Sequence, residues 1–258
     1  MRFCRGLAIV GSAGVLGLGS AVGGCASSKQ LAIETGAAAP PWAAGTVVVI
    51  EGGGDVVVWV DPAASEVTYS GRVGPRGSER GDLLATASAE WRALGGGTQA
   101  MVIAARPEQS WDAARVTLNV TVPSGAELNI TNQGGVVEVN GADGPLTVVN
   151  GPAGGEDGSI YVRTADAMAH EVSLTTTRGN VNYQVRTNIT GSFDLRAPNG
   201  SAIVSAPLTR MTGGGSPDGK AAAMVANQGT NRVVLRSDDG NVLLRVMSDP
   251  MSYRTAHP

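Results

Sequence analysis

Apolar residues recur at fixed distances from a series of glycines, and this pattern constrains the fold more than any other feature of the chain. With Gly240 as origin, Val233 and Leu235 stand seven and five residues before it, and Val242 and Leu244 stand two and four residues after it. Apolar residues at alternate positions face one side of a β-strand. Each unit is therefore predicted to be a strand, a glycine-bearing turn and a second strand, because glycine adopts positive φ without steric cost.

Five further glycines carry the same arrangement. Gly135, Gly158, Gly179 and Gly200 follow one another at steps of 23, 21 and 21 residues, and Gly240 comes 40 residues later, about two steps. The flanking apolar residues are Leu128, Ile130, Val137 and Val139 for Gly135; Val172, Leu174, Val181 and Tyr183 for Gly179; Phe193, Leu195, Ala202 and Val204 for Gly200; and Val47, Val49, Val56 and Val58 for Gly54.

Gly158 is the imperfect member, because the apolar pair before it, Leu146 and Val148, sits five residues early and the sequence GPAGGED supplies the insertion. One unit cannot bury its own apolar face, so the units are expected to stack at the strand spacing of about 4.8 Å. The chain is predicted to be all-β, a β-solenoid or a repetitive β-sandwich with rungs of about 21 residues. Each rung has two short strands joined by a glycine turn. An immunoglobulin-type sandwich also has alternating strands, but it does not repeat in one frame.

The composition agrees with short strands and limits the partners. The chain of 258 residues has 37 glycines, while aromatic residues make up only 4% and charged residues only 16%. The chain is dominated by valine, threonine and glycine, which favours many short strands joined by tight turns. Its net charge of −3 argues against a nucleic-acid partner, because phosphate binding needs a dense basic surface.

The first 24 residues are predicted to be a secretory signal peptide. Arg2 and Arg5 supply positive charge, and the sequence LAIVGSAGVLGLGSAV that follows is uncharged and moderately apolar. A permanent membrane anchor is the alternative, which the many glycines of this segment disfavour.

The end of that segment, VGGC at Val22–Cys25, resembles the lipobox of bacterial lipoproteins. The resemblance implies cleavage before Cys25 and a lipid on its thiol, which would hold the protein on a membrane. Cys4 would be lost with the signal peptide, so no intramolecular disulfide is expected. Ordinary cleavage that leaves Cys25 as a free thiol is the alternative. Because Ala26 is not the aspartate of an inner-membrane retention signal, the outer membrane is expected if the cell has two membranes.

These features predict the domain organisation. Residues 1–24 are the signal peptide, 25–44 a lipidated flexible tether, 45–250 a single β-solenoid-like domain, and 251–258 a C-terminal tail. Within the domain, 61–114 is assigned only weakly, since DLLATASAEWRAL is compatible with a strand or a short helix. The segment 210–230 is expected to be a loop insertion that occupies a missing repeat.

Three segments together resemble a known bacterial envelope domain. They are VTVPSGAELNITNQGGVVEVNG (Val120–Gly141), TTTRGNVNYQV and NRVVLRSDDGNVLLRV. The resemblance spans Gly45–Val246 and is to a domain of unknown function that carries the name "putative adhesin". It implies a β-solenoid-like fold and an envelope location, and it offers no catalytic residues.

Two motifs suggest chemistry but lack essential parts. GGSPDGKA at Gly214–Ala221 has the spacing of a phosphate-binding loop, yet Ala221 stands where the loop needs Ser or Thr for magnesium. A surface loop is therefore expected there. The chain has two histidines, His170 and His257, and no GxSxG elbow to present a serine nucleophile. No metal or cofactor site is predicted.

Two acidic pairs are further candidates: Glu156 with Asp157, and Asp238 with Asp239. Both fall where the repeat frame puts its turn, where Asp is favoured because it hydrogen-bonds nearby backbone. Sugar-cleaving enzymes use clustered acids, so an enzyme that acts on carbohydrate through Asp157 or Asp239 remains an alternative.

Outward-facing Arg and Asn residues in or beside the turns form a candidate binding edge. They are Arg178, Asn180, Arg196, Asn199, Arg236 and Asn241, called here the turn edge. Such a ladder suits a polymer such as peptidoglycan or another polysaccharide, and it also suits simple solvation and protection of the sheet edge.

The sequence thus predicts a lipid-anchored cell-envelope protein without its own catalysis, with a binding, adhesion or structural role. The alternatives are the carbohydrate-active enzyme and a scaffold for another envelope protein. The expected partners are the membrane, through the lipid, and an envelope polysaccharide or protein.

Overall fold

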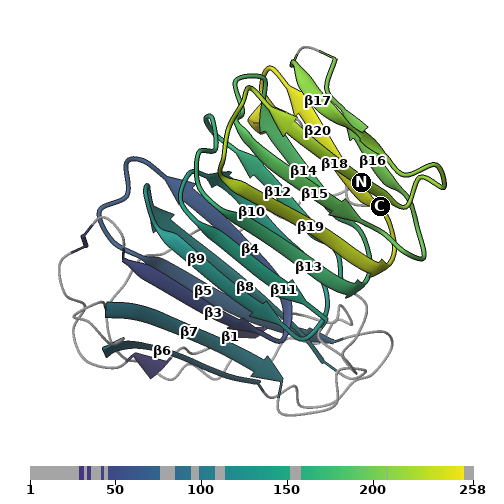
Figure 1. Ribbon diagram of the computed structural model, residues 1–258. Helices are drawn as coiled ribbons and strands as arrows, with labels where there is room; N and C mark the ends of the chain where they lie inside the picture. Colours follow the sequence, from purple (N-terminus) through teal and green to yellow (C-terminus); the bar gives the residue numbers. More distant parts are fainter. Residues whose placement is uncertain are drawn as a thin grey trace, which may run out of the picture.

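The computed structural model describes residues 29–31, 34–35, 42–43, 46–75, 85–93, 99–107, 114–151, 158–207 and 209–252. These residues form two mixed β-sheets, and the only helical element among them is a 3-10 turn, η2 (Pro250–Ser252) (Figure 1). The all-β prediction is confirmed. The signal peptide and Cys25 lie outside the described residues.

The nine-stranded sheet is called sheet A. In spatial order its strands are β1 (Lys29–Leu31), β5 (Thr68–Pro75), β8 (Ala114–Pro123), β4 (Gly54–Asp61), β10 (Val137–Ala142), β12 (Ile160–Thr164), β14 (Val181–Arg186), β20 (Val242–Met247) and β16 (Ala202–Ser205).

The eleven-stranded sheet is called sheet B. In spatial order its strands are β17 (Met211–Gly215), β18 (Ala221–Ala226), β15 (Gly191–Arg196), β19 (Arg232–Asp239), β13 (Val172–Arg178), β11 (Leu146–Asn150), β9 (Glu127–Asn132), β3 (Val47–Gly52), β7 (Gln99–Pro107), β6 (Ala85–Ala93) and β2 (Glu34–Thr35).

From β9 to β16, and again at β19 and β20, the chain alternates between the sheets, and neighbouring strands of this region are mostly parallel and in register. The residues that the repeat frame aligned pair with one another. One row in sheet A is Val56, Val137, Ile160, Val181, Val242 and Ala202. A matching row in sheet B is Val48, Leu128, Leu146, Val172, Val233 and Phe193.

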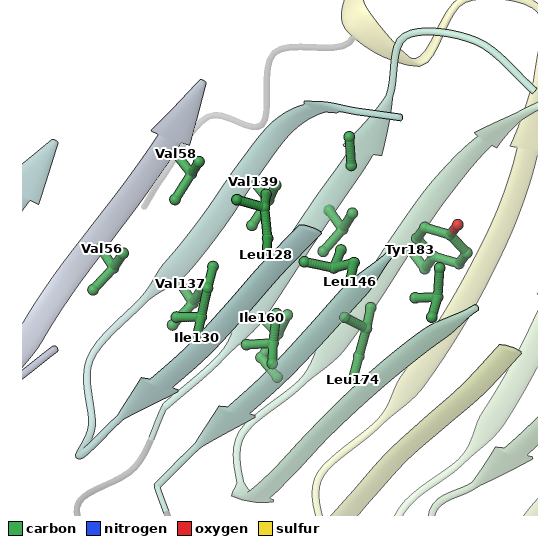
Figure 2. Close-up of a cluster of buried hydrophobic side chains, with 14 of the residues drawn as sticks. Val56, Val58, Leu128, Ile130, Val137, Val139, Leu146, Ile160, Leu174 and Tyr183 are labelled. Atoms are coloured by element: carbon green, nitrogen blue, oxygen red, sulfur yellow. The ribbon is translucent and has the colours of Figure 1, made fainter. Parts of the chain in front are cut away.

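These rows form the core between the two sheets. Figure 2 shows Val137, Ile160, Leu128 and Leu146 within this cluster, and each is at most 2% exposed. Burial of such a side chain contributes roughly 1.5–3 kcal/mol relative to exposure, so each added pair of strands extends a continuous apolar ribbon. Side-chain alternation, read from the glycines, predicted which residues face inward.

The earliest unit departs from the prediction by one residue. Val48 and Ile50 face the core, whereas Val47 and Val49 were expected there; Val47 instead packs with Ala100 on the other face of sheet B. The cause is a turn that is one residue shorter than the turn at Gly135. Gly52, two residues before Gly54, pairs with Asn132, which stands three residues before Gly135. A shift of one residue moves every side chain of a strand to the opposite face.

The segment 210–230 is not the expected loop insertion. Met211–Gly215 and Ala221–Ala226 pair as an antiparallel hairpin at one end of sheet B, beside β15. The glycine-rich composition that suggested a loop is compatible with a strand because this edge strand buries little side-chain surface.

The weakly assigned segment 61–114 contains strands. Thr68–Pro75 pairs with β8, and Ala85–Ala93, for which a helix was also considered, pairs antiparallel with β7. Its inward side chains are small, which explains the weak alternation signal: Ala87 and Ala89 are buried.

The turn glycines lie one above another in a column that follows the strand order. From one end it runs Gly54, Gly135, Gly158, Gly179, Gly240 and Gly200, called here the glycine column. A Cβ on Gly179 would lie within 3.0 Å of the carbonyl oxygen of Gly158, and a Cβ on Gly240 would meet the carbonyl oxygen of Gly179 in the same way. Glycine is therefore required for close backbone approach as well as for the φ of +86° at Gly135 and +125° at Gly179.

Four fully buried polar side chains, called here the polar ladder, lie beside the column: Asn132, Asn150, Thr176 and Ser237. Each donates a hydrogen bond to the carbonyl oxygen of a column glycine: Asn132 to Gly54 (2.8 Å), Asn150 to Gly135 (2.9 Å), Thr176 to Gly158 (2.6 Å) and Ser237 to Gly179 (2.6 Å). These bonds satisfy carbonyl groups that the tight stacking removes from water. The ladder was not predicted, and its signal is a polar residue two positions after the last inward apolar residue.

Alanine substitutions should separate the two reasons for glycine in the column, which are positive φ and close backbone approach. Gly179→Ala is expected to lower the free energy of unfolding by about 3 kcal/mol, because it combines positive φ with a backbone clash. Gly219→Ala, where φ is +70° but the space is open, should cost about 1 kcal/mol. Gly214→Ala has neither problem and should stay within about 0.5 kcal/mol. Urea denaturation measures all three, and equal losses at Gly179 and Gly219 would contradict the stacking requirement.

Tyr183 should make the fold sensitive to alkali. Its ring is fully buried, its hydroxyl has no hydrogen-bond partner among the described residues, and burial raises the pKa of the phenol above its usual value. The unfolded chain loses this proton above about pH 10 while the folded chain keeps it, so stability falls as pH rises.

Tyr183→Phe is therefore expected to raise the free energy of unfolding by about 1 kcal/mol at pH 7, because it removes a buried group without a partner. Its advantage over the native chain should grow above about pH 10. Urea denaturation across this pH range provides the measurement, and parallel pH profiles for both proteins would refute the assignment.

Candidate functional site

Two asparagines of the turn edge, Asn180 and Asn241, accept hydrogen bonds from the backbone of neighbouring turns. Asn241 N–H donates to Oδ1 of Asn180 at 2.9 Å, and Ser201 N–H donates to Oδ1 of Asn241 at 3.0 Å. Asn180 N–H in turn donates to Oγ of Ser159 at 3.1 Å. These exposed side chains therefore link successive turns on the solvent side, while the polar ladder links them on the buried side.

The arginines of the turn edge lie on three consecutive strands of sheet B. Arg196 and Arg236 are register partners on β15 and β19, and Arg178 is opposite Asp239 at the end of β13. Asp194 accepts two hydrogen bonds from Arg196, both 3.1 Å, and this hydrogen bonding raises the pKa of the guanidinium.

Arg236 has a similar local partner, because its Nε donates to Oδ1 of Asp238 at 2.8 Å. The structure thus brings these turn-edge residues together, with Asn199 exposed in the neighbouring turn. It also gives Arg196 and Arg236 an acidic neighbour two residues away.

Of the two acidic pairs that the sequence suggested as candidate sites, the structure describes one. Asp238 and Asp239 lie at the end of β19, where Asp238 forms the ion pair with Arg236. Glu156 and Asp157 lie outside the described residues, as does His257. Within the described ranges, no group of three or more His, Cys, Asp or Glu side chains is close enough to hold a metal ion. His170 is exposed, and its carbonyl oxygen accepts a hydrogen bond from Asn231.

The segment that resembles a phosphate-binding loop forms the turn of the β17–β18 hairpin. Ser216 Oγ accepts the N–H of Lys220 at 3.1 Å and that of Ala221 at 2.9 Å. Asp218 also accepts the N–H of Lys220, and its hydrogen bond from Ser216 lowers the pKa of its carboxyl. Backbone donors that a phosphate would need are therefore already occupied by the turn itself.

An open groove crosses the outer face of sheet B and was not predicted. Its volume is about 460 Å³. Its lining includes Glu127, Asn129, Thr147, Glu171, Ser173, Arg232 and Val234. Within it, Asn129, Thr147, Ser173 and Val234 are register neighbours on β9, β11, β13 and β19. This feature, called here the sheet B groove, therefore presents the short polar side chains of Asn129, Thr147 and Ser173 at steps of one strand spacing, about 4.8 Å.

The repeat pattern around the glycines did not predict the groove, because the groove is formed by outward positions of the strands and not by the turns. The available signal is the residue between two inward apolar positions: Asn129 between Leu128 and Ile130, and Thr147 between Leu146 and Val148. Alternation identifies such residues as outward-facing, but only the pairing of the strands places them beside one another.

The outer face of sheet A contains a contrasting, enclosed polar cluster. Arg163 donates to the carboxylate of Glu138 and to Oδ1 of Asn140, and the Arg163 side chain is only 6% exposed. Gln184, the neighbour of Arg163 in the next strand, is also buried. The turn η2 lies against β12 and β14, the strands that carry Arg163 and Gln184. This cluster is occupied by the chain's own contacts, whereas the sheet B groove is open.

Comparisons with known proteins give one distant structural neighbour. No protein-family model matches the chain, and no curated protein matches it. A crystal structure described as a "putative cell adhesion protein" from Clostridium sporogenes is similar with a TM-score of 0.49 and 9% sequence identity. The similarity covers 80% of this chain and 94% of that chain. Across the residues that the structure describes, no helix is long and apolar enough to span a membrane.

Proposed function

We propose that this protein is a lipid-anchored component of the bacterial cell envelope that binds an extended envelope polysaccharide, without chemical turnover, through the sheet B groove. The observation that carries the binding role is the register of Asn129, Thr147 and Ser173 across three neighbouring strands. Amide and hydroxyl groups at regular steps complement the hydroxyl groups of a polysaccharide.

The backbone beneath the groove favours such a role. Its strands are hydrogen-bonded on both sides within sheet B, and their inward residues Ile130 and Leu174 are fully buried. A surface held in this way loses little conformational entropy when a ligand binds. Glu127 and Glu171 at the groove add negative charge and Arg232 adds positive charge, which suits a polymer that carries both amine and carboxylate groups.

The proposed architecture is a β-solenoid-like domain over residues 45–250, tethered by residues 25–44 to a lipid on Cys25. In-register pairing of the aligned apolar positions and the continuous glycine column support repeated rungs. The sequence VGGC after an apolar segment supports the lipid anchor and an envelope location. A tether of about 20 residues would let the groove reach material beyond the membrane surface.

A bulky residue in the groove should abolish binding without disturbing the core. Ser173→Trp places a large ring at an outward position of β13 and is expected to weaken binding to purified peptidoglycan or envelope polysaccharide about tenfold or more, which is about 1.4 kcal/mol. Asn182→Trp, at an outward position on sheet A, is the matched control and should bind like the native protein. Co-sedimentation with insoluble glycan measures both variants.

Equal binding by Ser173→Trp and the native protein would disprove the groove assignment. The carbohydrate-cleaving alternative gives another result: soluble sugar fragments would appear with the native protein and disappear with Asp239→Ala. The proposed role predicts that no fragments appear and that Asp239→Ala binds normally.

Lipidation has its own test. Mass spectrometry of the mature N-terminal peptide is expected to show acylated Cys25, and the native protein should partition into detergent. Cys25→Ser should remain in the aqueous phase, because it lacks the thiol that accepts the lipid. Cys4→Ser serves as the control and should be processed normally. An unmodified Cys25 in the mature protein would contradict the anchor.

A further inference from the structure

The last unit of the chain lies inside the stack. Strands β19 and β20, called here the C-terminal unit, separate β13 and β14 from β15 and β16. The chain therefore runs through β15 to β18 before it returns to the space between these strands and the preceding unit, where β19 and β20 lie (Figure 1). The order of the units in space therefore differs from their order along the chain, in which Gly240 follows Gly200.

The C-terminal unit fits this space on both sides. Val233 pairs in register with Val172 of β13 and with Phe193 of β15, and Val242 pairs with Val181 and Ala202 in sheet A. All of these pairings are parallel. A strand–turn–strand segment with another pattern would leave backbone donors and apolar rows unmatched.

The turn of the C-terminal unit also belongs to the glycine column and the polar ladder. Gly240 stacks between Gly179 and Gly200 in the glycine column, and Ser237 donates to the carbonyl oxygen of Gly179. Leu235 and Leu244 are fully buried. The space is thus specific for the sequence that fills it, whether that sequence comes from the same chain or from a second copy.

A short and strained connection joins β18 to the C-terminal unit. Residues 227–231, called here the hinge, cross from one side of β15 to the other, about two strand spacings of ~4.8 Å. Asn227 and Gln228 have φ values of +49° and +57°, and Gly229 N–H donates to the carbonyl oxygen of Ala226 at 3.0 Å. Two consecutive residues with positive φ define a type I′ turn, in which the second position favours glycine.

We propose that two copies of this chain exchange their C-terminal units, so that β19 and β20 of each copy fill the space in the other. Every contact of the unit is kept in the exchanged dimer, and only the hinge changes. Opening the hinge releases the left-handed conformation of Gln228, and a short strained hinge favours exchange. Exchange occurs during folding, because removing the unit from a folded monomer would expose its buried apolar rows.

Changes at Gln228 test the role of the hinge. The full chain, with Cys4 and Cys25 replaced by serine, is refolded at high protein concentration and measured by size-exclusion chromatography with light scattering. Gln228→Gly relieves the strain and should lower the dimer fraction severalfold, whereas Gln228→Val, a β-branched residue, should raise it. Equal dimer fractions for the native residue and Gln228→Gly would overturn the proposal, as would monomers at every concentration.

A cross-link distinguishes exchange from contact between outer faces. Ser173 on β13 and Val234 on β19 are register neighbours, at a spacing that a disulfide spans. One copy carries Ser173→Cys and the other Val234→Cys, and the two are refolded together under oxidising conditions. Exchange predicts a disulfide-linked heterodimer, which a mixture of separately folded copies should not form. Dimers without this cross-link would refute exchange even if Gln228→Val failed to fold.

Discussion

The fold depends on close packing between the glycines of neighbouring turns. The carbonyl group of one glycine occupies the space that a side chain on the glycine of the next turn would fill. Because the turns stack at strand spacing, the backbone of each turn occupies the place where a side chain of its neighbour would lie, as between Gly158 and Gly179. Close stacking also removes turn carbonyls from water, which would be costly without partners. The polar ladder supplies these partners from inside, and Asn180 and Asn241 bind the turns from outside. Apolar burial between the sheets is possible only once the turns can approach in this way.

The same arrangement explains why the outer faces differ in what they offer. Register fixes which side chains are neighbours across strands, so a row of outward residues becomes a surface with a regular spacing. On sheet B this produces an open groove of short polar groups, while on sheet A the outward row around Arg163 is enclosed. At the turn edge, Asn180 and Asn241 accept hydrogen bonds from the backbone of neighbouring turns, and Arg196 and Arg236 pair with nearby acids.

Much of the core was predictable, because alternation around a glycine is a local property. Leu128, Val137 and Val181 were assigned to the core from their distance to a glycine, and all are buried. The misplacement of Val47 and Val49 has an equally local cause: the turn at Gly52–Gly54 is one residue shorter. Because all four residues from Val47 to Ile50 are apolar, alternation does not show which of them face inward. The polar ladder was missed because a buried asparagine has the same appearance in a sequence as an exposed one.

The sequence by itself determined the all-β class, the inward residues of most units and the turn positions, since these follow from alternation and from the conformational freedom of glycine. The predictions of export and of lipidation at Cys25 also come from the sequence alone, because they rest on linear motifs. The tertiary structure decided the order of the units, the location of the C-terminal unit between earlier ones and the residues that share the sheet B groove. The physical reason is that units with the same alternation of apolar residues can pair in register with any other such unit. The pattern alone therefore does not fix which units become neighbours. Their order is settled by chain connectivity and by the hairpin of Met211–Ala226, which occupies the sheet B edge beside β15.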